Sequence, residues 1–188
     1  MDTPARPDAR TMRRLLALAS ACWLGTAGPA RSETTRSLPA AGAPSLAVSF
    51  FVDRKLGAAL QPSLEEAARK LSDSGCQQLL TDFADDAGHS LGENLHTIGQ
   101  SLPGYLALVL FYDGSTTEPC ENGRVLAWTS PGSRAVLVCS RQFATWQRAN
   151  VGYTANIVIH EALHTLGLGE RPPTPAQITA RVTERCGP

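Results

Sequence analysis

The stretch NIVIHEALHTLGLGE, residues 156–170, combines an apolar helix pattern with a marked end. Its valine, isoleucine, alanine and leucine residues predict a buried helix over 153–166. Gly167 follows the last helical leucine, where its access to positive φ can end the helix. His160 and His164 lie four residues apart and therefore share one face of that helix. The stretch predicts a central helix that directs two imidazoles toward one point and then breaks at a glycine.

The patterns around this helix predict an α+β fold. A capping box at Ser63 and Glu66 predicts that one helix begins there. Thr174 followed by Pro175 predicts the start of a C-terminal helix. We expect a single domain over 45–188, with the site helix and the C-terminal helix packed on a mixed or mostly antiparallel sheet. The expected strands are 45–53, 105–114, 124–130 and 134–143, and the expected helices are 63–76, 153–166 and 172–186.

The N-terminus has the layout of a secretory signal peptide. A basic lead precedes an apolar run that ends in small residues, and the run is too short to span a bilayer comfortably. We expect residues 1–30 to be this signal and 31–44, rich in Ser, Thr, Ala and Pro, to form a flexible leader. The alternatives are an N-terminal membrane anchor and lipidation at Cys22. The signal peptide predicts a secreted or periplasmic protein.

The charge balance argues against nucleic acid as a partner. The whole chain carries 17 basic and 17 acidic residues, and residues 1–30 contain four arginines and two aspartates, so cleavage would leave a net charge of about −2. No basic patch remains that would bind nucleic acid. The longest later apolar run, 106–112, has the length of a strand, so we expect no transmembrane segment after the signal.

Four cysteines remain beyond Cys22, and an even number in an exported chain predicts two disulfides. Cys120 and Cys139 flank the expected hairpin, which favours that pair. Cys76 and Cys186 would then form the second bridge and tie the C-terminal segment to the domain. A cysteine zinc site would normally include a C-x-x-C pair, which the sequence lacks.

His160, the glutamate directly after it and His164 have the spacing of a zinc hydrolase site. His160 and His164 can bind one metal ion, while Glu161 lies about 100° round the helix from His160. Zinc held by three protein groups keeps a position for water and lowers the pKa of that water to about 7. Glu161 can then act as the general base, taking the proton as the water attacks a carbonyl and passing it to the leaving amine.

The segment HEALHTLGLGE resembles the metzincin pattern H-E-x-x-H-x-x-G-x-x-H/D of zinc endopeptidases. The match covers about eleven residues, and Glu170 stands in the place of the third ligand. The resemblance implies that His160, His164 and Glu170 bind zinc, that Glu161 is the catalytic base, and that Gly167 lets the chain turn back toward the metal. It also implies a peptide or protein as substrate. We expect the protein to act as a monomer.

Two departures from that pattern leave the third ligand open. Metzincins usually have His or Asp at the position of Glu170, and they have a methionine turn after the site, whereas this chain has no methionine beyond Met12. Glu184, 20 residues after His164, is the alternative ligand, because a glutamate on a later helix binds zinc in thermolysin-like enzymes. The glycine break favours Glu170 over Glu184.

Other candidates carry weaker patterns. Residues 82–96 gather aspartate, glutamate and histidine, but their spacing fits no calcium loop, and a solvated acidic segment is the simpler interpretation. Tyr153 can either face a substrate cleft or pack in the core.

The sequence thus predicts an exported zinc peptidase. The alternatives are a non-catalytic zinc-binding domain and a disulfide-stabilised interaction domain without metal.

Overall fold

The computed structural model describes residues 54–188. The expected signal peptide, the leader and the strand over 45–53 lie outside the described residues. Within the described part the chain combines helices with a small sheet, which confirms the α+β prediction. No helix among these residues is both long and apolar enough to cross a membrane.

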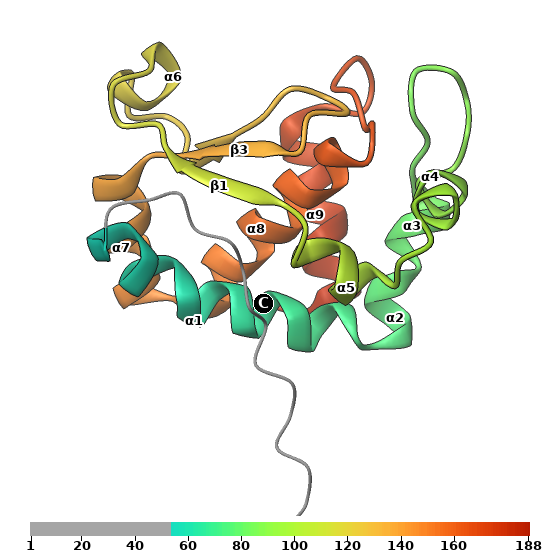
Figure 1. Cartoon of the computed structure of the whole chain (residues 1–188), viewed down its shortest axis with the longest axis horizontal. Helices are drawn as coiled ribbons and strands as arrows, with labels where there is room; N and C mark the ends of the chain where they lie inside the picture. Colours follow the sequence, from blue (N-terminus) through green and yellow to red (C-terminus); the bar gives the residue numbers. More distant parts are fainter. Residues whose placement is uncertain (1–53) are drawn as a thin grey trace, which may run out of the picture. The chain divides into compact units, whose positions relative to one another are not determined.

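Helix α8 (Val151–Thr165) is the element on which the other long helices pack. Helix α1 (Arg54–Leu71) contacts it, as do α7 (Ser140–Ala149) and α9 (Pro175–Cys186). Figure 1 shows α1 along one side of the domain, with α8 between it and the strands. Ile159 and Leu163 of α8 are completely buried. A helix can be buried on so many sides because its backbone hydrogen bonds are satisfied internally.

The sheet contains three short strands, β1 (Leu110–Asp113), β2 (Ala127–Trp128) and β3 (Ala135–Val138), in the order β1-β3-β2. β3 runs parallel to β1 and antiparallel to β2. The predicted hairpin is therefore present, with Ala127 opposite Val138, and the sheet is mixed. β2 forms one edge of the sheet and contacts α8, so that edge lies beside the site helix.

Several boundary predictions were wrong. The expected strand over 124–130 is reduced to β2, and the helix expected to end at 76 ends at Leu71. Ser63 does not begin a helix: it lies inside α1, completely buried, with its hydroxyl 2.7 Å from that of Thr154 on α8. Packing between two helices outweighs the local capping pattern there. The expected strand over 105–114 is shorter than predicted. Its first residues belong to α5 (Leu102–Leu106), and β1 begins only at Leu110. The expected strand over 134–143 ends at Val138, where α7 follows.

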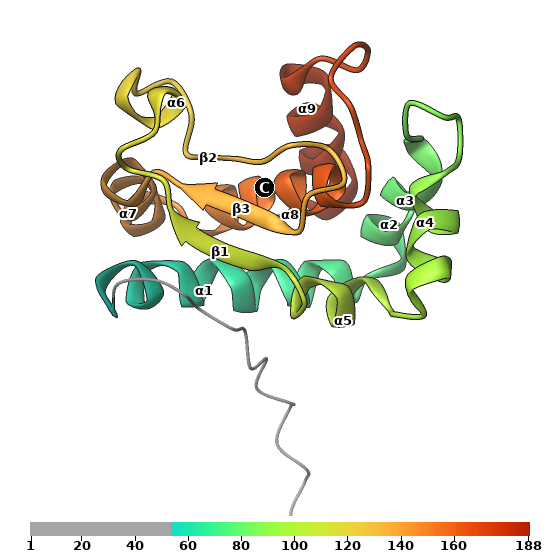
Figure 2. The same cartoon turned by 45° about the horizontal axis from the view of Figure 1, so that its top comes forward.

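The remaining helices are short, and two disulfides fix the segments beside them. They are α2 (Ser74–Gln77), α3 (Leu79–Asp82), α4 (Leu91–Ile98) and α6 (Glu118–Glu121). Figure 2 shows α2, α3 and α4 grouped at the end of α1 that lies far from α7. Cys76 pairs with Cys186 and Cys120 pairs with Cys139, which confirms both expected bridges. The first joins α2 to the end of α9.

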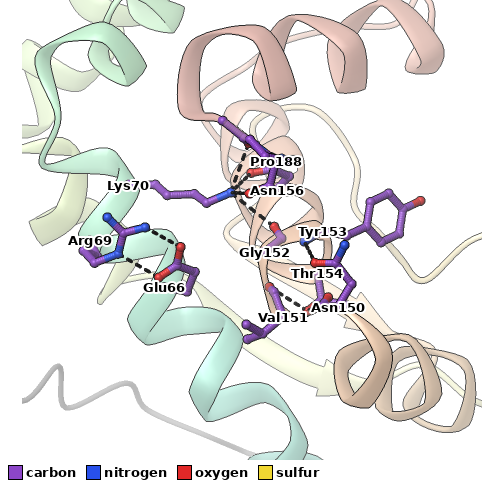
Figure 3. Close-up of polar contacts among 11 residues, drawn as sticks. Glu66, Arg69, Lys70, Asn150, Val151, Gly152, Tyr153, Thr154, Asn156 and Pro188 are labelled. Carbon is purple, nitrogen blue, oxygen red and sulfur yellow. Dashed lines mark hydrogen bonds and ion pairs between the residues drawn. The ribbon is translucent and has the colours of Figure 1, made fainter.

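A buried ammonium group joins α1, α8 and the C-terminal residues (Figure 3). Lys70 Nζ donates hydrogen bonds to Asn156 Oδ1 at 2.8 Å and to the carbonyl oxygens of Gly187 and Pro188 at 3.1 and 2.8 Å. Burial lowers the pKa of Lys70, and the nearby Glu66 carboxylate opposes that effect. Asn156 lies one turn before His160, so this contact helps to fix where α8 carries its histidines.

Replacing Lys70 by methionine should destabilise the fold by about 1–3 kcal/mol, because oxygens of α8 and of the C-terminal residues lose the donor that they share. Urea unfolding followed by circular dichroism measures the change. Arg69→Met is the matched control: this neighbouring cation is exposed and pairs only with Glu66 on its own helix, so its loss should leave the midpoint nearly unchanged. Equal effects of the two substitutions would contradict the bridging role of Lys70.

Candidate metal centre

His160 and His164 direct their Nε2 atoms toward each other from successive turns of α8. The two atoms are 3.0 Å apart, and both side chains are buried. Each Nδ1 atom has a partner on the other side of its ring. His164 Nδ1 lies 2.6 Å from the carbonyl oxygen of Leu168, and His160 Nδ1 lies 3.0 Å from the hydroxyl of Thr179 on α9. The contacts at Nδ1 thus orient both rings so that their Nε2 atoms point toward the same place.

The contact with Leu168 fixes the tautomer of a neutral His164 ring, whereas the Thr179 hydroxyl can either accept from His160 Nδ1 or donate to it. A carbonyl oxygen can only accept, so His164 Nδ1 donates to Leu168 and the Nε2 atom of the neutral ring presents a lone pair. The Thr179 hydroxyl can accept in the same way from His160. Two lone pairs 3.0 Å apart repel each other, unless a proton or a cation lies between them. The donor set therefore fits a metal ion.

Glu170 completes a group of three ligand atoms. Gly167 ends α8 with a φ of 111°, a conformation that favours glycine, and the chain then turns back so that Glu170 Oε1 lies 3.1 Å from His164 Nε2. The ligand atoms of His160, His164 and Glu170 all lie within 4.8 Å of one another. This group could hold a metal ion, and the sequence pattern had named all three residues.

The alternative ligand, Glu184, is placed elsewhere. Its carboxylate pairs with Arg181 Nη1 at 3.1 Å on the same helix, and 62% of its side chain is exposed. It does not belong to the group formed by the two histidines and Glu170. The geometry among the described residues thus favours Glu170, for which the glycine turn supplies the route.

Glu161 lies beside this group and is itself buried. Its Oε2 atom has no hydrogen-bond partner among the described residues, the only buried side-chain atom there of which this is true. Burial, with a smaller contribution from Glu170, raises the pKa of Glu161 to about 8. Burial, with a contribution from His164, lowers the pKa of His160 to about 3. A cation at the histidines would favour the charged carboxylate and so act against the first shift.

A cleft of about 700 Å³ gives access to these side chains. One wall comes from the segment that includes β2, with Leu126 and Trp128, and another comes from α8, with Tyr153 and Ile157. His160, Glu161, His164 and Glu170 all line it. Tyr153 therefore faces the cleft, one of the two positions that its sequence context allowed, while its ring also packs on Trp146 with centroids 5.2 Å apart.

The segment 82–96 supports the turn after α8 and does not form a metal cluster of its own among the described residues. Asn94 Nδ2 donates to the carbonyl oxygen of Leu166 at 2.9 Å and to Asp85 Oδ2 at 3.0 Å. Asp85 Oδ1 also accepts from the backbone amides of Ala87 and His89. The sequence did not reveal these contacts, because polar residues of a loop give no sign of which distant carbonyl they will meet.

Thr179 was likewise missed, since one threonine on an amphipathic helix carries no pattern. Its contact with His160 follows from the way α9 packs on α8.

Comparisons with protein-family models, curated proteins and solved structures gave no match for this chain. The centre is therefore interpreted from its own geometry.

Replacing Thr179 by valine should weaken binding of a divalent metal by about 10- to 100-fold, because His160 loses the partner that orients its ring. Competition with a coloured chelator measures the dissociation constant, and Thr179→Ser should restore it. Thr145→Val is the matched control, since that exposed hydroxyl on α7 donates to its own helix at the carbonyl of Arg141. Unchanged affinity in Thr179→Val would contradict the orienting role.

Asp85 should make the stability of the metal-free protein depend on pH. The hydrogen bond from Asn94, followed by those from the loop amides, lowers its pKa from 3.8 to about 2. A lowered folded-state pKa means that the stabilisation is complete above the unfolded value of 3.8 and is lost as pH falls toward 2. The difference in urea midpoint between wild type and Asp85→Asn should therefore shrink over that interval. A difference that stays constant with pH would refute this assignment.

Proposed function

We propose that this protein is a zinc-dependent peptidase in which His160, His164 and Glu170 hold the metal and Glu161 is the general base. The single observation that carries the proposal is the juxtaposition of a three-ligand group with a buried carboxylate whose Oε2 has no partner among the described residues, all within one cleft. Two imidazoles and one carboxylate are a donor set that zinc takes in catalytic sites. The metzincin-like order of the residues supports the same choice.

When bound, zinc polarises a substrate carbonyl and lowers the pKa of a coordinated water molecule. The remaining work falls to side chains of the chain itself. Glu161 would accept the proton from the attacking water and deliver it to the leaving amine. Its burial excludes bulk water from that carboxylate, and the lack of a competing hydrogen bond among the described residues leaves Oε2 available. Thr179 and Leu168 would keep both histidines in the orientation that the metal requires.

We propose further that the protein acts outside the cytoplasm, on peptides or unfolded segments of proteins. Two disulfides are typical of chains that fold in an oxidising compartment, and the sequence begins with the layout of a signal peptide. A cleft lined partly by apolar side chains suits an extended peptide, whose backbone and side chains can be bound along the segment that includes β2.

Substitution of Glu161 by glutamine should reduce peptide hydrolysis at least about 100-fold while one zinc ion per chain stays bound. Glu170→Ala should lose both zinc and activity, because the third ligand is removed. Glu184→Ala is the control and should keep both, since Glu184 lies outside the group. Cleavage of a mixed peptide library is followed by mass spectrometry, with metal content measured on the same samples.

The pattern of results separates the proposal from its rivals. Full activity in Glu161→Gln would contradict the role of Glu161 as the general base. Stoichiometric zinc with no hydrolysis by the wild type would indicate a metal-binding domain without catalysis. Absence of bound zinc after purification and after incubation with the metal would indicate an interaction domain stabilised by its disulfides.

A further inference from the structure

Two guanidinium groups line the same cleft as the candidate metal centre and have no partner among residues 54–188. Arg124 and Arg171 are exposed and contribute to its walls, and neither makes a hydrogen bond or an ion pair with the described residues. Arg148 on α7 is also exposed without a partner among the described residues but lies outside the cleft, whereas some other arginines of the fold are paired. Arg69 pairs with Glu66, and Arg185 pairs with Asp82. The two cleft arginines are therefore cations that the described part of the fold does not neutralise.

Arg171 has no ion pair within the described part of the chain, although a carboxylate precedes it directly. Glu170 turns its Oε1 atom toward His164 Nε2, at 3.1 Å, and makes no ion pair with Arg171 among the described contacts. A further carboxylate of the cleft, Asp86, lies against Gly169: a methyl group placed on that glycine would come within 2.6 Å of Asp86 Oδ1. Asp86 likewise forms no ion pair with either arginine among the described residues.

Arg124 reaches the cleft from the other segment of the wall. It follows Gly123, whose φ is 66°, and it lies in the loop that the Cys120–Cys139 disulfide closes. Leu126 and Trp128 continue that wall toward β2. A ligand that spans the cleft would thus meet apolar surface and a guanidinium near each of the two segments.

We infer that Arg124 and Arg171 select substrates that carry a carboxylate near the bond to be cut, an inference that rests on the proposed peptidase function. Guanidinium groups bind carboxylates through paired, charge-assisted hydrogen bonds. With a divalent cation bound, the metal and the two guanidiniums together would outweigh the carboxylates of Asp86, Glu161 and Glu170 that line the same cleft. The carboxylate can come from a glutamate or aspartate side chain of the peptide, or from the C-terminus of a short peptide.

The test uses matched peptides that contain either Glu or Gln beside the cleaved bond, each with a free or an amidated C-terminus. Zinc-loaded wild type should cleave the preferred acidic form with a kcat/KM about tenfold higher, and that ratio should fall as salt rises from 0.01 to 0.15 M. Arg171→Gln and Arg124→Gln should each lower the ratio. Arg148→Gln is the control, an exposed arginine on α7 outside the cleft, and it should keep the wild-type ratio.

The two sources of the carboxylate give different patterns. A preference for Glu that persists with an amidated terminus identifies the side chain, whereas a preference for the free terminus regardless of Glu identifies a short-peptide substrate. Cleavage with no preference for either carboxylate, or with a preference that both arginine variants retain, overturns the inference and leaves the proposed peptidase intact.

A binding measurement tests the inference without turnover. Zinc-loaded Glu161→Gln should bind the acidic peptides about tenfold more tightly than the neutral ones by calorimetry, and adding Arg124→Gln or Arg171→Gln should remove that difference. If wild type cleaves no peptide while this arginine-dependent difference is present, the proposed function fails and the carboxylate specificity of the cleft stands. Equal affinity for acidic and neutral peptides overturns the specificity.

Discussion

The burial of α8 on almost every side is the constraint from which the site follows. A helix backbone satisfies itself, but each polar side chain carried into the core needs a partner. Nearly all of those on α8 have one. Asn156 meets Lys70, Thr154 meets Ser63, Thr165 meets Tyr105, His160 meets Thr179 and His164 meets the carbonyl of Leu168. Glu161 Oε2 is the exception among the described residues, and it lies at the cleft beside the histidines. Among the described residues, the departure from full pairing thus falls at the cleft, beside the group that could hold a metal ion.

The partners of α8 come from segments far apart in the sequence. Lys70 is on α1, Thr179 is on α9, and Asn94 holds the carbonyl of Leu166 at the end of α8. The disulfide between Cys76 and Cys186 ties the end of α9 back to α2. Two of the three candidate ligands lie on one rigid helix, and the groups that orient them are fixed by the surrounding elements, so the group needs little rearrangement if it is to accept a metal ion.

The sequence predicted what is local and missed what packing decides. The site helix, the glycine turn, the Thr174 cap and the hairpin follow from short-range patterns, and all are present. Ser63 has an equally good local pattern, yet α1 continues through it, because its side chain is buried against α8. The ligand group could be named because three residues lie within eleven positions. Thr179 and Asn94 could not, since their roles depend on which helices meet.

The closeness of the ligands in sequence has a consequence for folding. Bringing His160, His164 and Glu170 together closes only a short loop, so the entropic penalty is small even in a chain that has not yet folded elsewhere. The walls of the cleft, by contrast, come from segments tens of residues apart. A metal ion that also has affinity for the unfolded chain adds less to global stability than one bound only by the native state. The three candidate ligands could therefore come together before the walls of the cleft have formed.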